Sequence, residues 1–141
     1  MLRRGTKNKS FQQINDEIDK LKSNVGIRGD GQTVNVSITT TKENLSGILN
    51  LIGEIIKQPA FAQAEFDKLK EEQISNLESS RSEPQSIAFR VFGKTLNPYP
   101  KDDFRYEMSF DEEKDALNKL TLADIKNFYE RFYNTSNATA A

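Results

Sequence analysis

The sequence contains no histidine and no cysteine among its 141 residues. Zinc in proteins is usually held by imidazole nitrogens or thiolates, with carboxylates as additional ligands. A chain without either residue type lacks the side chains of an ordinary zinc site. It also lacks a histidine general base and a cysteine nucleophile. The function must therefore be sought in a scaffold, a partner or a piece of a larger protein.

The chain also lacks a charge excess and long apolar runs. Its 20 Lys and Arg residues nearly balance its 21 Asp and Glu residues, for a net charge of −1. Nucleic-acid-binding domains usually carry a clear basic excess, so we expect no nucleic-acid partner. No apolar run approaches the roughly 20 residues that span a bilayer, and no targeting segment is visible. We expect neither a membrane span nor a signal peptide in this chain.

The hydrophobic pattern of the first 40 residues predicts a helix followed by a β-hairpin. Ser10 and Gln13 form a capping box, and the residues that follow place apolar side chains at helical spacing. The pattern then alternates, first at Val25 and Ile27 and again, after a glycine-containing turn at 29–31, at Val34, Val36 and Ile38. We expect these residues to face a core. The opposite face of the second strand would carry Thr33, Asn35, Ser37 and Thr39.

The remaining pattern predicts five helical stretches. The pair Thr40–Glu43 resembles a capping box before an apolar stripe (Leu45, Ile48, Leu49, Ile52, Ile55 and Ile56) that ends at Pro59. A long charged helix follows from about residue 62 to 80, and Pro84 can begin the next one, with Ile87, Ala88, Val91 and Phe92 facing inward. Capping pairs Ser109–Glu112 and Thr121–Asp124 begin the last two. The fold class is α+β: a small antiparallel sheet with several helices packed on it.

This element order contains an incomplete sheet. A two-stranded hairpin alone is marginally stable in water, so the strand at 33–39 needs a partner. We expect strands that precede residue 1 in a longer protein, or a neighbouring chain, to complete the sheet. In the isolated fragment this need predicts self-association.

Several motifs, in their order and spacing, resemble the pitrilysin/insulinase-type zinc metallopeptidases. Residues 1–6 (MLRRGT), followed by the capped helix, resemble the segment that comes directly after the H-x-x-E-H helix of active members. The similarity continues at 33–36 (TVNV), 42–45 (KENL), 58–61 (QPAF), 99–106 (YPKDDFRY) and 120–125 (LTLADI), and at 132–139 on the approach to the final strand of the domain. The resemblance covers nearly the whole chain and is greatest to periplasmic-type bacterial members.

The resemblance implies that the metal site is missing. In active members the third zinc ligand is a glutamate on the long helix, and the position that matches it here is Asn76. A second acidic position matches Leu69. We therefore expect no catalytic residue, no metal ligand and no cofactor in this chain, although the family uses zinc. Under another register Glu71, Glu72 or Glu78 would be the ligand, but a solvated helix face is favoured.

The resemblance also implies a function and leaves alternatives. Residues 1–141 would be a single peptidase-like domain without its N-terminal strands and metal helix. It would be an inactive domain that helps to enclose an unfolded peptide, periplasmic or secreted, beside a homologous zinc-bearing domain or subunit. The peptide would lie along Thr33, Asn35, Ser37 and Thr39, by strand addition. The alternative is that 33–39 is an interior strand that pairs on both sides. The alternatives are a fragment of a catalytic domain whose H-x-x-E-H precedes residue 1, and a helical interaction module unrelated to proteolysis.

Overall fold

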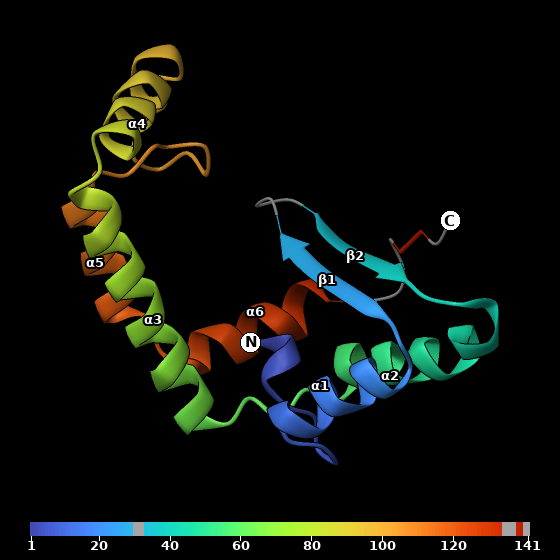
Figure 1. Cartoon of the computed structure of the whole chain (residues 1–141). Helices are drawn as coiled ribbons and strands as arrows, with labels where there is room; N and C mark the ends of the chain where they lie inside the picture. The colour runs from blue at the N-terminus through green and yellow to red at the C-terminus, as the bar shows by residue number, and fades with distance from the viewer. Residues whose placement is uncertain (30–32, 134–137, 140–141) are drawn as a thin grey trace. The chain divides into compact units, whose positions relative to one another are not determined.

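The structure is a computed structural model that describes residues 1–29, 33–133 and 138–139. These residues form six α-helices, short 3-10 turns and one two-stranded antiparallel sheet, so the α+β prediction is confirmed (Figure 1). The chain divides into two compact units, Met1–Glu65 and Phe66–Ala141. Each unit is described by itself, and the single domain expected over 1–141 stays a prediction.

The first unit contains the hairpin between two helices. Its elements are η1 (Leu2–Arg4), α1 (Phe11–Lys20), β1 (Asn24–Gly29), β2 (Val34–Thr39), η2 (Lys42–Asn44) and α2 (Leu45–Lys57). The capping box of α1 is present, since Ser10 Oγ accepts from the Gln13 backbone N–H and Gln13 Oε1 accepts from the Ser10 N–H. These two bonds satisfy donors that the first helical turn leaves without intrahelical partners.

One apolar cluster holds the first unit together. It contains buried residues from both helices and from β1: Ile14, Ile18, Val25, Ile48, Leu51, Ile52 and Ile55. Val36 and Ile38 of β2 are half-buried and pack against it. Burying one such side chain fully contributes about 1.5–3 kcal/mol. The core therefore determines which face of β2 points inward.

The hairpin has the predicted pairing and faces. Val25 lies opposite Ile38, and Ile27 lies opposite Val36. Thr33, Asn35, Ser37 and Thr39 are exposed, as expected for the other face. Val34 differs from the prediction, because this apolar residue at the start of β2 remains 42% exposed. The predicted turn lies partly at 30–32, outside the described residues.

The start of α2 differs from its predicted form. The 3-10 turn η2 occupies Lys42–Asn44, and the N-cap of α2 is Asn44, which makes no capping hydrogen bond with its side chain. Because the helix begins after Glu43, that residue cannot act as the fourth member of a capping box. The helix also buries Leu51 and leaves Leu45 and Leu49 exposed, so its inner face is rotated from the predicted stripe.

The second unit contains the remaining helices. They are α3 (Gln63–Arg81), whose first residues belong to the first unit, α4 (Pro84–Leu96), α5 (Phe110–Lys119) and α6 (Leu122–Phe132). Pro84 occupies the first turn of α4, as predicted. Both predicted capping boxes, at Ser109 and at Thr121, are present.

The inward face predicted for α4 is wrong. Ile87, Ala88, Val91 and Phe92 are all exposed. The helix instead places Arg90 against the unit, where its guanidinium donates to the Met108 carbonyl and to Glu113 and stacks on the ring of Phe110 at 4.1 Å. This anchor orients the helix with its polar side inward. In α6, Phe128 and Phe132 are exposed. The expected approach to a final strand lies partly at 134–137, outside the described residues.

Candidate functional site

Strand β2 is the element that the sequence predicts to bind peptide, and its position within the first unit is now defined. It hydrogen-bonds to β1 on one side, and among the described residues no strand lies on its other side. The four predicted residues, Thr33, Asn35, Ser37 and Thr39, are exposed together on the face that points away from the core. The structure therefore brings the predicted residues onto one accessible surface beside an open strand edge.

The outer face of β2 is built from short polar side chains. Asn24, Gly26 and Arg28 of β1 lie opposite Thr39, Ser37 and Asn35 of β2. Gly26 matters for close approach, because a Cβ atom at this position would lie 2.7 Å from Ser37 Oγ. With glycine there, Ser37 can lie across the neighbouring strand. The result is a low polar face without large side chains on β2.

The two edges of the hairpin have different chemistry. Arg3 Nη1 donates to the carbonyl of Val25 in β1 at 2.9 Å, and Arg3 Nη2 donates to Asn15 Oδ1 in α1 at 3.2 Å. Strand β1 also carries the exposed Arg28. Residues 33–41, in contrast, contain no charged residue and no proline. Charges and prolines are the usual features that keep an edge strand from pairing, so β2 has the less protected edge.

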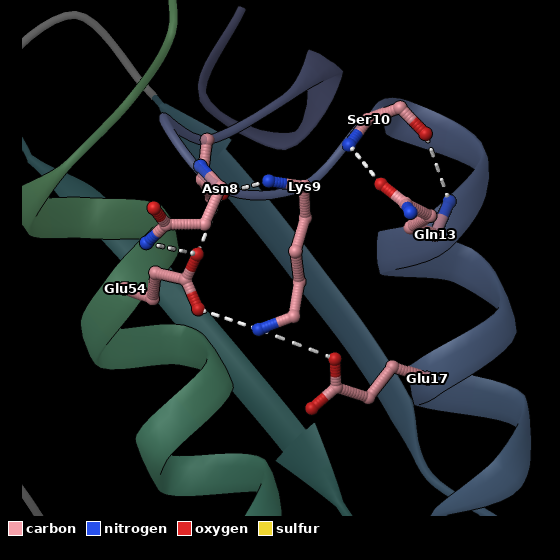
Figure 2. Close-up of polar contacts among 7 residues, drawn as sticks. Asn8, Lys9, Ser10, Gln13, Glu17 and Glu54 are labelled. Carbon is pink, nitrogen blue, oxygen red and sulfur yellow. Dashed lines mark hydrogen bonds and ion pairs between the residues drawn. The ribbon is translucent and has the colours of Figure 1, made fainter.

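A cluster of polar side chains connects the loop after η1 with α1 and α2. We call it the Glu54 cluster, and it consists of Thr6, Asn8, Lys9, Glu17 and Glu54. Figure 2 shows Lys9 extending between Glu54 of α2 and Glu17 of α1. Lys9 Nζ lies 2.6 Å from Glu54 Oε2 and 3.4 Å from Glu17 Oε2. Glu54 Oε1 accepts from Thr6 Oγ1 at 2.7 Å and from Asn8 Nδ2 at 3.3 Å.

The charges of this cluster stabilise each other. The hydrogen bond from Lys9, followed by that from Thr6, lowers the pKa of Glu54 below its usual value of 4.5. The hydrogen bond to Glu54 raises the pKa of Lys9 above 10.5. Both groups are therefore ionised across the neutral range. A permanently paired carboxylate is suited to holding the loop in place and not to transferring protons.

The Glu54 cluster does not follow from the sequence patterns described above. A signal was present, since Glu54 is the one acidic residue in α2, a helix with a mainly apolar sequence. A lone carboxylate beside buried isoleucines needs polar partners, and Thr6 is the buried polar residue that supplies one. The backbone also holds this loop in place, since Gly5 forms an isolated β-bridge with Ser10 and Thr6 forms one with Pro59.

The position that matches the glutamate ligand of active members does not fit zinc. Asn76 lies exposed on α3, and an amide is a poor ligand for zinc. The neighbouring Glu78 is paired with Lys114, with 2.6 Å between Oε1 and Nζ. Within the described parts of the chain, no group of three or more acidic side chains is placed to hold a metal ion. The described residues around position 76 therefore do not fit zinc.

Comparison with known proteins identifies the family of this chain. The family model of the insulinase peptidases, peptidase family M16, matches residues 1–97. The chain belongs to this family. The matched segment includes the Glu54 cluster, the hairpin and the helices α3 and α4. Among curated proteins, no match was found.

A solved structure supports the fold of this insulinase-family chain. The crystal structure of a peptidase M16 inactive domain from Pseudomonas fluorescens aligns with a TM-score of 0.73 and 19% sequence identity. The alignment covers 92% of this chain and 31% of that chain. This chain therefore spans less than a third of the length of that neighbour. At this level of identity the likeness establishes the fold. No helix of the described segments is long and apolar enough to cross a membrane.

Proposed function

We propose that this chain is a non-catalytic domain of an M16-type peptidase, which helps to enclose and bind an unfolded peptide. The zinc would be held by a homologous domain or subunit beside it. Membership of the family supports the peptidase context, and the aligned protein from Pseudomonas fluorescens is itself an inactive M16 domain. Asn76 at the position of the family's glutamate ligand supports the non-catalytic role of this chain, together with its lack of histidine and cysteine.

The observation that carries the peptide-binding part is the uncharged edge of β2. An extended peptide can hydrogen-bond to the main chain of such an edge, and the side chains at alternate positions then adjust specificity. Because the main chain supplies these bonds, binding tolerates many peptide sequences. That property suits a domain that receives unfolded substrates. The periplasmic or secreted localisation that the resemblance implies remains part of this proposal.

Binding of a labelled, unstructured peptide tests the proposal. Fluorescence anisotropy would be measured with the wild-type chain at a concentration at which it is monomeric, with and without added zinc. We expect binding that does not require zinc and is not followed by cleavage. The Ser37→Asp variant places a charge on the outer face of β2 and should weaken binding, whereas Asn24→Asp places the same charge on β1 and should not.

The outcomes separate the alternatives. Zinc-dependent cleavage by this chain would contradict the non-catalytic role. Equal binding by wild type and Ser37→Asp, with both folded, would contradict the assignment of the site to β2. No binding at all would contradict the peptide-binding part of the proposal.

A further inference from the structure

Helix α4 is held in the second unit mainly by polar contacts, because it adds little to an apolar core. None of its residues is buried. Its large apolar side chains are 42–68% exposed: Ile87, Phe89, Val91, Phe92 and Leu96. The half-buried residues fall along one face of the helix: Ser86, Arg90 and Gly93. Burial of apolar surface therefore contributes less to holding α4 in place than it does to the first unit.

One guanidinium, that of Arg90, joins α4 to the start of α5. It donates to the Met108 carbonyl and, at 2.7 Å, to Glu113 Oε2, and it lies 4.1 Å from the centre of the aromatic ring that begins α5. Lys94 adds a looser contact, with its Nζ 5.7 Å from the centre of the Tyr106 ring. The Arg90 and Glu113 side chains are 22% and 40% exposed, so salt in the solvent can screen this ion pair.

The first turn of α5, which receives the guanidinium of α4, is itself tied to α3. Two ion pairs join this turn to α3, Arg81–Asp111 at 2.7 Å and Glu78–Lys114 at 2.6 Å. At the other end of α5, Lys70 Nζ of α3 donates to two backbone carbonyls, at 2.7 and 3.0 Å. Helices α3 and α5 are therefore joined at both ends of α5, and they form a frame against which α4 is fastened.

The connection between α3 and α4 is short and suited to act as a pivot. Two residues, Ser82 and Glu83, separate the helices. Pro84 has no backbone N–H, and its ring keeps Glu83 extended, with φ −94° and ψ 117°. The helical hydrogen-bond pattern is therefore interrupted between α3 and α4. Because α4 has 13 residues, it is about 20 Å long, and a small rotation at this connection moves its far end by several ångströms.

We propose that α4 is a movable arm, which pivots at Ser82–Glu83 and is latched to the first turn of α5 by Arg90. When Arg90 leaves Glu113, α4 turns as an intact helix while the frame of α3 and α5 stays in place. A latch made of a partly exposed ion pair opens more readily as the ionic strength rises, because the screening length falls from about 30 Å at 0.01 M to about 3 Å at 1 M. This inference does not depend on peptide binding by β2.

The distance between two spin labels tests this proposal, and the absence of native cysteine allows each label to be placed at one position. Thr95→Cys carries one label at an exposed position near the far end of α4, and Asn118→Cys carries the other at an exposed position of α5. Double electron–electron resonance on the full chain, at 0.01 M and at 1 M NaCl, gives the distribution of distances between the labels.

We expect one main distance at low salt, from the latched arm, and a second population that grows at high salt. Its ratio to the first should rise by about two- to fivefold, as expected when a partly exposed ion pair is screened. Glu113→Gln removes the charge opposite Arg90, so it should raise the second population already at low salt and remove most of its dependence on salt.

Asp115→Asn is the matched control, since it removes the same charge from an exposed position two residues further along α5. It should give the distances of the wild type at both salt concentrations. Circular dichroism should show equal helix content in all these chains, because the arm moves without unfolding. A wild-type distribution that does not change with salt, an equal effect of Glu113→Gln and Asp115→Asn, or a loss of helix content at high salt would overturn the proposal.

Discussion

The Glu54 cluster allows a quantitative prediction about what holds the first unit together. Glu54 receives two short hydrogen bonds, from Thr6 at 2.7 Å and from Lys9 at 2.6 Å, and a longer one from Asn8. The Lys9 and Glu54 side chains are 28% and 17% exposed, so water screens the pair less than an ion pair on the surface. Hydrogen bonds to charged groups contribute about 1.5–3 kcal/mol each to stability.

These contacts give expected costs for two substitutions. Glu54→Ala removes both short bonds and leaves the buried Thr6 hydroxyl without its acceptor, so we expect it to destabilise the unit by about 3 kcal/mol. Glu54→Gln retains an amide oxygen for Thr6 but loses the charge opposite Lys9, and should cost about 1–1.5 kcal/mol. The larger loss is a substantial part of the roughly 5–15 kcal/mol typical of a domain.

Amide hydrogen exchange measures this loss at named positions. Backbone amides of Ile48 and Ile55, in the buried part of α2, report the opening of the first unit. The amide of Leu77, in α3 of the second unit, serves as an internal control. We expect Glu54→Ala to lower the opening free energy at the two α2 amides and to change Leu77 much less.

The pH dependence adds a second test of the same reasoning. The folded pKa of Glu54 is lowered from 4.5, so its contribution is present above about pH 4.5 and is lost as the pH falls through the lowered value. The pKa of Lys9 is raised from 10.5, so its contribution is complete below 10.5 and is lost at higher pH. The difference between wild type and Glu54→Gln should therefore be constant near neutrality. A difference below about 0.5 kcal/mol throughout, or one that grows in acid, would refute the role assigned to Glu54.

Three further predictions concern the metal, the strand and the first turn of α5. Calorimetry on the metal-free chain should detect no stoichiometric zinc site of sub-micromolar affinity, and Asn76→Glu should produce no peptidase activity, since one carboxylate cannot replace two imidazoles and a general base. Val36→Asp should unfold the first unit in a circular dichroism melt, because it places an unpaired carboxylate against the core, whereas Ser37→Asp should melt near wild type. The hydrogen bonds from Lys101 and from the Ser109 backbone lower the pKa of Glu112 to about 2, so an NMR titration should place its midpoint near there, and a midpoint above about 4, the ordinary range of a glutamate, would contradict the pairing.

The elements of this fold could be predicted because their signals are local. Capping boxes at Ser10, Ser109 and Thr121 lie within four residues, and each one appears where it was expected. The hairpin was predictable because alternation over six residues indicates both the strand and its inner face. The capping box predicted at Thr40–Glu43 is wrong because the 3-10 turn η2 precedes α2. Composition alone does not distinguish such a turn from the first turn of an α-helix.

The contacts that join distant segments could not be predicted from the same patterns. Helix α4 has an apolar stripe that should face inward, yet Arg90 and its partners, Met108 before α5 and Glu113 in α5, turn that stripe outward. The Glu54 cluster joins residues that are 45 to 48 positions apart, and no spacing rule relates them. Such contacts depend on which elements the core brings together, and that information is distributed over the whole unit.

The candidate site on β2 combines a feature that local sequence predicts, its inner face, with one that depends on distant segments, its outer edge. The inner face of β2 is determined by Val36 and Ile38, which the core of the same unit selects. The outer edge of β2 has no neighbouring strand among the described residues. Its own residues carry no charge that would prevent another strand from pairing there. A strand with a fixed face and an open, uncharged edge accepts any extended segment that matches its alternation. The residues of β2 therefore do not by themselves determine what binds at this edge, and the comparison of Ser37→Asp with Asn24→Asp decides whether a peptide does.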